Sequence, residues 1–271
     1  AEAPRLTISV TRLEQLSPAL LELGCPARVY IPLEEVSRLE SLPGEGPEWC
    51  AVLPRVWRDR DEPALRTLLE WARALGFTGV LIGNLGHLPL VRGLDFHLYG
   101  DYGLNVFNSR SLAYLKDKEL ESACVSFELR FAQIRDLKKV LRAEAIVYGR
   151  LPLMITENCL VQNETGCRLD RQGPCVPEDG PCRCGQPNVL VDRTGAAFPL
   201  LPAYGHRTEI QNSKPLYLAD RPEHRRLGLA YARLRFTTET AEECVSVVQN
   251  YLDAAPAAGD FTRGLYERGV E

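Results

Sequence analysis

The 271-residue sequence predicts an α/β fold, a closed or distorted TIM-like (β/α) barrel in a single domain over residues 1–271. Three observations predict this fold class. Eight strand-like segments recur along the chain, helical segments lie between most of them, and the length is typical of single α/β barrels. Strands that alternate with helices form parallel βαβ units, and eight units favour a barrel over an open sheet.

The predicted strands are short apolar or alternating segments. They begin at Leu6, Ala27, Trp49, Gly79, Phe96, Ala123, Ala145 and Leu229.

Four helices are predicted from apolar residues at helical spacing, over 12–24, 62–76, 130–144 and 240–255. Pro63 lies near the first turn of the second helix, and glycines end the first two helices.

One connection is much longer than the others, because about eighty residues separate the seventh strand from the eighth. We expect residues 149–228 to form an insertion at the C-terminal face of the barrel, where active sites are built. Five of the nine cysteines lie in this insertion. They are Cys159, Cys167, Cys175, Cys182 and Cys184.

This cysteine density indicates a zinc or iron-sulfur site, since thiolates are soft, anionic ligands for both. Seven residues separate Cys159 from Cys167 and sixteen separate Cys167 from Cys184, which is not the spacing of a zinc ribbon. Disulfides and reduced, packed cysteines are the alternatives. The other four cysteines, Cys25, Cys50, Cys124 and Cys244, are predicted to be buried small hydrophobes.

Polar residues follow several predicted strands and are candidates for one pocket at the barrel mouth. They are Asn84, Asp101, Asn105, Asn108, Glu128, Arg130 and Arg150. Glu128 directly follows a strand and is a candidate cation ligand or general acid or base. Arg130 and Arg150 are candidates to clamp a carboxylate or phosphate. For Asn84, Asp101 and Asn108, helix capping or turn chemistry is the alternative.

Charge and hydropathy narrow the possible partners. A net charge of −4 gives no overall attraction to nucleic acid, so an RNA contact would need a local basic patch. No apolar stretch is long enough to span a membrane and no signal peptide begins the sequence, so we expect a cytoplasmic protein without a membrane partner. The only methionine is Met154, and we expect a fragment of a longer chain, whose remainder would be a partner.

Several motifs together resemble peptidase family U32, the collagenase-like peptidases. They are GDYGLNVFNS, SFELRFAQI, VYGRLPLMITENC, LVDRTGAAFPL, RTEIQNSKPLYL and FTRGLYERGV, and they cover the chain from about Asn84 onward. Each motif alone is weak, but the ordered set is specific.

The resemblance implies a TIM-like barrel with four ligands for a 4Fe-4S cluster. Cys159, Cys167 and Cys184 match the first three ligands, and His206 stands where the family has its fourth cysteine. An imidazole in place of a thiolate would raise the potential of a cluster. Cys182 or Cys175 is the alternative fourth ligand, and zinc or no metal is the alternative to a cluster.

Three functions remain open from the sequence. Relatives of the family take part in hydroxylation of tRNA, ribosomal RNA or ubiquinone, which implies an RNA base or a small aromatic or carboxylate substrate, with Arg193 and Arg207 as candidates to face phosphates. The second function is a peptidase, with Cys159 as nucleophile and His206 as base. The third is a noncatalytic, metal-stabilised module that binds RNA or protein.

Overall fold

The computed structural model describes residues 3–165 and 187–269. The chain forms two compact units. Unit 1 consists of Ala1–Gly149 and Leu216–Glu271, and unit 2 is Arg150–Pro215.

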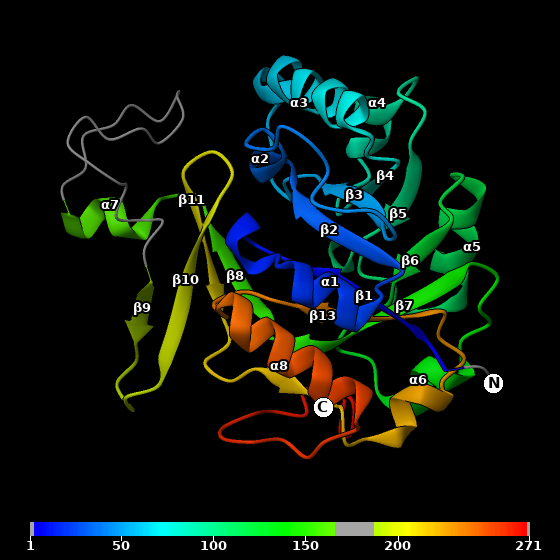
Figure 1. Ribbon diagram of the computed structural model, residues 1–271, viewed down its shortest axis with the longest axis vertical. Coiled ribbons are helices and arrows are strands. Elements are labelled where there is room, and N and C mark those ends of the chain that lie inside the picture. The colour runs from blue at the N-terminus through cyan, green and yellow to red at the C-terminus, as the bar shows by residue number, and fades with distance from the viewer. Residues whose placement is uncertain (1–2, 166–186, 270–271) are drawn as a thin grey trace. The chain divides into compact units, whose positions relative to one another are not determined.

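Unit 1 is a closed barrel of eight parallel strands (Figure 1). The strands are β1 (Arg5–Ser9), β2 (Arg28–Pro32), β3 (Glu48–Val52), β4 (Gly79–Ile82), β5 (His97–Gly100), β6 (Ser122–Cys124), β7 (Arg142–Gly149) and β13 (Tyr231–Arg235). Each strand pairs with its neighbours in parallel, and β13 closes the barrel by pairing with both β7 and β1. The predicted TIM-like fold is confirmed, and each predicted strand overlaps a barrel strand.

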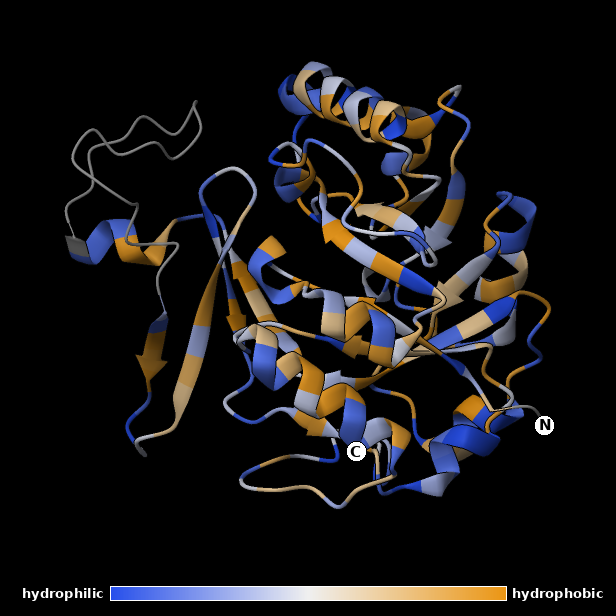
Figure 2. Ribbon diagram, viewed as in Figure 1, coloured by the Kyte–Doolittle hydropathy of each residue, from blue (hydrophilic) through white to orange (hydrophobic). Residues whose placement is uncertain are grey.

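Helices connect the strands of unit 1. They are α1 (Pro18–Gly24), α2 (Leu33–Val36), α3 (Glu62–Leu75), α4 (His87–Val91), α5 (Ser109–Asp117), α6 (Phe131–Asp136) and α8 (Ala241–Leu252), with short 3-10 turns η1 (Leu13–Gln15), η2 (Asp59–Asp61), η3 (Tyr102–Leu104) and η5 (Pro222–Arg226). In α3 the apolar side chains Leu65, Leu69 and Ala72 recur on one buried face, whereas hydrophilic residues occupy much of the rest (Figure 2). Gly76 ends this helix with φ 102°, a left-handed conformation that favours glycine.

The predicted helix over 130–144 is wrong in length. Helix α6 ends at Asp136, and β7 begins at Arg142. The Lys139 ammonium donates hydrogen bonds to the carbonyls of Ile134 and Leu137, at 2.6 and 3.3 Å, so a cation satisfies the end of the helix. Extending the helix would also remove Glu144 from the barrel strand on which it lies.

Unit 2 is inserted between β7 and β13. Its strands are β8 (Pro152–Thr156), β9 (Asn188–Val191), β10 (Ala197–Ala203) and β11 (Arg207–Gln211), with helix α7 (Leu160–Thr165) after β8. They form an antiparallel sheet in the order β8-β11-β10-β9. Residues 216–228, which the sequence placed in the insertion, belong to unit 1, where β12 (Leu216–Tyr217) pairs with β7. Cys167, Cys175, Cys182 and Cys184 lie outside the described residues.

Among the described helices, none has the length and apolar character required to cross a membrane.

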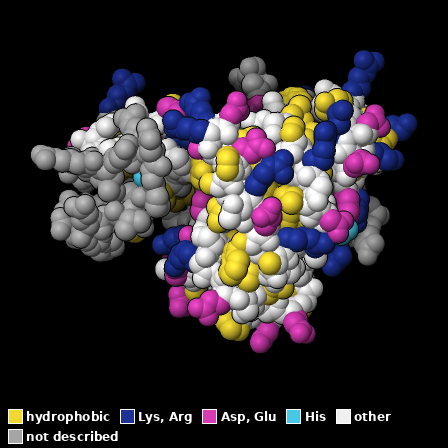
Figure 3. Space-filling model, turned by 90° about the horizontal axis from the view of Figure 1, so that it is seen from above, with side chains coloured by type: hydrophobic (Ala, Val, Ile, Leu, Met, Phe, Trp, Pro, Cys, Tyr) yellow, Lys and Arg dark blue, Asp and Glu magenta, His cyan; other side chains and the backbone are white. Residues whose placement is uncertain are grey.

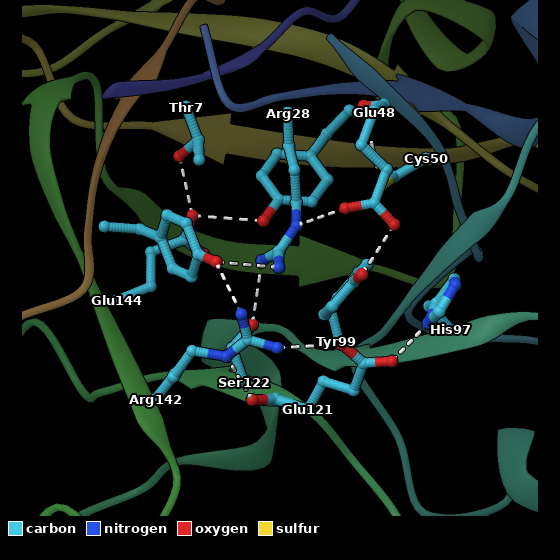
Figure 4. A network of polar contacts seen from close by, with 12 residues as sticks. Thr7, Arg28, Glu48, Cys50, His97, Tyr99, Glu121, Ser122, Arg142 and Glu144 are labelled. Carbon is cyan, nitrogen blue, oxygen red and sulfur yellow. Dashed lines mark hydrogen bonds and ion pairs between the residues drawn. The ribbon is translucent and has the colours of Figure 1, made fainter. Parts of the chain in front are cut away.

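The interior of the barrel contains a buried ionic group centred on Glu144 (Figure 4). The Glu144 carboxylate accepts hydrogen bonds from Thr7 at 2.6 Å, from Tyr30 at 3.1 Å and from the Arg233 guanidinium. Arg233 also donates to Asp101 at 2.5 Å. Burial opposes the charge of Arg233, but the two carboxylates hold its pKa well above the usual value.

A second polar group lies at the N-terminal end of the barrel. Arg28 donates to Glu48 at 2.8 Å, to Ser122 at 2.9 Å and to Tyr231 at 3.1 Å, and its guanidinium lies 3.6 Å from the centroid of the Tyr99 ring. Figure 4 shows Arg28, Glu48, Tyr99 and Ser122 converging from different strands. Because hydrogen bonds cross the barrel, they fix the positions of the strands relative to one another.

Glu144→Gln should destabilise the protein by about 3 kcal/mol or more, because it leaves Arg233 buried with one carboxylate fewer. Glu14→Gln is the control, since its ion pair with Arg38 is exposed and is expected to contribute at most about 1 kcal/mol. Urea unfolding of both variants measures the difference. Equal losses of unfolding free energy would contradict a special role for the buried carboxylate.

Gly149→Ala should also destabilise the protein strongly. Gly149 has φ 119°, and a Cβ at this position would lie 2.0 Å from the carbonyl oxygen of Arg235. The expected cost is about 3 kcal/mol or more, from backbone strain and overpacking together. Gly46→Ala is the matched control, because Gly46 has φ 113° but no atom within 4 Å of the added Cβ, so only about 1–2 kcal/mol is expected. Comparable unfolding free energies for the two variants would rule out the close contact.

Candidate functional site

A pocket of about 240 Å³ lies at the C-terminal mouth of the barrel. Its lining comes from the segments that follow β3, β5 and β6, and consists of Arg55, Tyr102, Gly103, Asn105, Ser126, Phe127 and Glu128. The sequence predicted Asn105 and Glu128 for this mouth. It missed Arg55 and the two aromatic residues, because nothing local distinguishes them from surface residues.

The stem of Arg55 passes beside two glycines. A Cβ on Gly103 would lie 2.6 Å from the carbonyl oxygen of Gly83 and 3.2 Å from Cδ of Arg55, and one on Gly83 would lie 3.7 Å from Cγ of Arg55. Gly103 therefore has no room for a side chain where the segments after β4 and β5 approach, whereas a Cβ on Gly83 would make only ordinary van der Waals contacts. The stem of Arg55 lies in the slot beside these two residues.

Tyr102 is the centre of the charged and aromatic contacts at the mouth. Its ring centroid lies 5.7 Å from the Arg55 guanidinium and 5.8 Å from the Arg235 guanidinium. The Phe127 ring lies 5.8 Å away, tilted by 51°. These distances are within the range of cation–π and aromatic interactions, so the contacts favour a defined orientation of the tyrosine ring.

His87 supports the segment that carries Arg55. Its ring is buried, and Nε2 lies 3.1 Å from the carbonyl oxygen of Pro54, the residue before Arg55. A carbonyl oxygen only accepts, so Nε2 carries the proton and Nδ1 is unprotonated in the neutral ring. Burial lowers the pKa of His87 to about 4, so the ring is neutral at pH 7.

Asp101 lies at the end of β5 and is part of the buried ionic group. Its carboxylate accepts from Arg233, and its backbone N–H donates to the carbonyl of Ile82 at 2.8 Å. The side chain does not cap the following turn. The capping alternative therefore does not apply to this residue, which instead positions Tyr102, its neighbour in the chain.

Asn84 and Asn108 take part in a turn and in a helix cap, which were the predicted alternatives to substrate binding. Asn84 accepts a hydrogen bond from the backbone N–H of Gly86 at 2.8 Å, which is turn chemistry. Asn108 caps α5 by accepting from the backbone N–H groups of Arg110 and Ser111, both at 3.0 Å.

The two arginines proposed as a clamp lie in different units. Arg130 precedes α6 in unit 1, and its aliphatic stem lies against Gly269. Arg150 belongs to unit 2, where its guanidinium donates to the carbonyls of Asn212 and Ser213. These contacts stabilise the turn after β11.

The end of unit 2 that carries Cys159 is fixed by β11. Thr156 of β8 is opposite Thr208 of β11, and continuing this antiparallel register places Asn158 opposite His206. The Arg207 guanidinium binds both oxygens of Glu157, at 3.0 and 2.7 Å, which agrees with that register. Cys159 and His206 therefore lie at the same end of the strand pair.

Each of the two candidate ligands in the described part of unit 2 occupies a defined backbone position. Cys159 is buried before α7, and its thiol accepts a hydrogen bond from the backbone N–H of Gln162 at 3.4 Å. His206 lies in the turn between β10 and β11 with φ 59°, an uncommon conformation for a residue other than glycine. Within residues 3–165 and 187–269, no three or more His, Cys, Asp or Glu side chains form a group suited to a metal.

The other predicted residues with charges or thiols are distributed as follows. Arg193 is exposed in the turn between β9 and β10, whereas Arg207 is buried in its ion pair.

The remaining cysteines of unit 1 differ in their exposure. Cys50, Cys124 and Cys244 are buried as predicted, but Cys25, at the C-terminal end of α1, is exposed. Figure 3 shows basic and acidic side chains interspersed on one face of the molecule.

A second hollow, of about 280 Å³, lies at the opposite end of the barrel. Most of its charged lining residues are in ion pairs, since Arg73 binds Asp95 at 2.8 Å and Glu121 binds both His97 and Arg142. Active sites of (β/α) barrels lie at the C-terminal face. The smaller mouth pocket is therefore the better candidate.

His87→Gln should change how stability depends on pH. The folded-state pKa of about 4 lies below the unfolded value near 6.5, so the unfolded state binds more protons as the pH falls from about 7 to about 5, which costs about 2 kcal/mol. Burial raises the pKa of Glu34 to about 7, so this residue makes stability change with pH in the opposite direction. Because Glu34 is present in both the wild type and the variant, its effect cancels in the comparison. The difference in unfolding free energy between wild type and variant should therefore shrink by about 2 kcal/mol on acidification. A pH-independent difference would contradict a neutral buried ring.

Solved structures of low sequence identity cover most of the chain. The U32 peptidase Mk0906 matches with a TM-score of 0.47 at 10% identity, over 89% of this chain and 96% of that one. A tryptophan synthase α-subunit variant from Pyrococcus furiosus has a TM-score of 0.49 at 8% identity, over 93% and 99% of the two chains. Thiamine phosphate pyrophosphorylase from the same organism has a TM-score of 0.43 at 8% identity, over 92% and 95%.

The family of this chain follows from its match to a family model. No curated protein matches this sequence. The model of peptidase family U32 matches residues 42–188, more than half of the 271 residues, across most of the barrel and into unit 2. The chain belongs to peptidase family U32.

Proposed function

We propose that this chain is an iron-sulfur protein of family U32 that acts in, or assists, the hydroxylation of an RNA base or a small aromatic substrate. The observation that carries the proposal is the position of Cys159 and His206 at one end of the β8–β11 strand pair. Cys167 and Cys184 are the other two proposed ligands, with Cys182 or Cys175 as the alternative to His206.

The donor chemistry of the described residues fits such a cluster. A thiolate and an imidazole are both ligands of iron-sulfur centres, and histidine replaces cysteine in some of them. Leu160, next to Cys159, donates its backbone N–H to the Thr208 hydroxyl at 3.0 Å, which ties the cysteine segment to β11. When bound, the cluster would supply electron transfer or a Lewis acid for the substrate.

The barrel mouth supports the substrate part of the proposal. A pocket at the C-terminal face, with one guanidinium, one carboxylate and two aromatic rings, suits a small polar ring compound. Glu128 is our candidate for proton transfer, because it lines this pocket. Contact with RNA would require basic groups, and Arg193 is the more accessible of the two predicted arginines, because Arg207 is already paired with Glu157.

The contacts of Cys159 do not favour the peptidase alternative. A cysteine nucleophile needs a neighbouring base to become a thiolate. The Cys159 thiol accepts a hydrogen bond from the backbone N–H of Gln162, and a backbone N–H cannot act as that base. We therefore propose a ligand role for this thiol.

Oxygen-free purification should yield a coloured protein with about four iron and four sulfide ions per chain. Cys159→Ala should lose most of this iron, because a ligand is removed. Cys25→Ala is the matched control, since it also removes one thiol but from an exposed position in unit 1. Iron and sulfide analysis with absorption spectra measures both variants.

Two results would overturn the proposed cofactor. One is a colourless protein without iron after anaerobic reconstitution. The other is equal iron content in the Cys159 and Cys25 variants.

A further inference from the structure

We infer that the mouth pocket binds a small zwitterion with a flat apolar body, of the class of the aromatic α-amino acids. This inference rests on the proposed function only in taking the mouth as the substrate site. The charged groups and aromatic rings of the pocket indicate the class of substrate.

Among the described residues that line the pocket, one carries a positive charge and one a negative charge. Arg55 supplies a guanidinium and Glu128 a carboxylate, and both line the same hollow. A guanidinium binds a carboxylate through paired hydrogen bonds, and a carboxylate accepts hydrogen bonds from an ammonium group. A ligand that carries both groups can bind both residues, whereas Glu128 would repel a dianion such as a phosphate ester.

The rest of the lining suits an aromatic body. The Tyr102 and Phe127 rings lie 5.8 Å apart and are tilted by 51°, so they present two different ring surfaces to the pocket. Such an arrangement accepts a third ring in a stacked or edge-to-face contact. A volume of about 240 Å³ suits a single-ring ligand and lies below the usual range for drug-sized ligands.

The groups of the pocket are held in place by the barrel. The stem of Arg55 occupies the slot beside Gly83 and Gly103. His87 binds the carbonyl of Pro54, the residue before Arg55. On the other side, Ser126 is 3% exposed, donates its backbone N–H to Val106 and accepts from the backbone N–H of Glu128. The cation and the carboxylate therefore come from fixed segments after different strands, which favours a preorganised site.

Titration of the anaerobically purified protein with four probes tests this inference, using calorimetry or ligand-observed NMR. L-Phenylalanine carries both charges, 3-phenylpropionate only the negative one, phenethylamine only the positive one, and inorganic phosphate has no ring. L-Phenylalanine should bind at least about tenfold more tightly than either singly charged analogue, and phosphate should not compete with it.

Two charge-removing variants make the test specific to the pocket. Arg55→Gln should weaken binding of L-phenylalanine about tenfold or more and leave phenethylamine unaffected. Glu128→Gln should weaken L-phenylalanine similarly but should not weaken phenylpropionate, since a repulsive charge is removed. Arg92→Gln and Glu40→Gln change exposed residues away from the pocket lining and should leave all affinities within about twofold.

The outcomes separate this inference from the proposed function. Equal binding of phenylalanine and phenylpropionate would overturn the zwitterion, and phosphate binding that depends on Arg55 would make the pocket an anion site instead. No binding by an iron-loaded protein would overturn the inference and leave the proposed cofactor intact. Selective phenylalanine binding by a protein without iron would support the inference and overturn the cofactor.

Discussion

The rest of the barrel depends on the ionic contact of Arg233 with Glu144 and Asp101. Burying a guanidinium is costly unless it is paired and hydrogen-bonded, and here β7 and the end of β5 each supply a carboxylate. Apolar side chains of similar volume could stabilise a barrel equally well. The ion pair instead fixes the position of Asp101 at the end of β5. Tyr102 is the next residue in the chain, so its position is fixed as well.

The mouth pocket lies beside the end of β5, where two backbone segments approach each other closely. The segment after β5 lies so close to the segment after β4 that Gly103 has no room for a Cβ against Gly83. The same absence of side chains admits the stem of Arg55. The position of the Arg55 stem in this pocket is therefore a consequence of close backbone packing.

The sequence predicted what is local in the chain and missed what depends on contacts between distant segments. The eight strands were predictable because apolar runs and alternation are local patterns, and Glu128 was predictable because it closely follows an apolar segment that contains β6. Arg55 and His87 were not, since their roles depend on glycines and a carbonyl from other segments. The helix over 130–144 was predicted too long because its apolar spacing continues past Asp136, and only the tertiary structure requires Glu144 on β7.

Under the proposed function, the charges near β11 explain how a histidine could replace a thiolate. Glu157 already neutralises Arg207, with both carboxylate oxygens bound to the guanidinium, so this arginine adds little net positive charge to that end of unit 2. A cluster with four thiolates would carry one more negative charge than a cluster with three thiolates and a neutral imidazole. Because Arg207 is already paired, an imidazole in place of a thiolate would reduce the negative charge that this end must accommodate, and it would raise the reduction potential for the same reason.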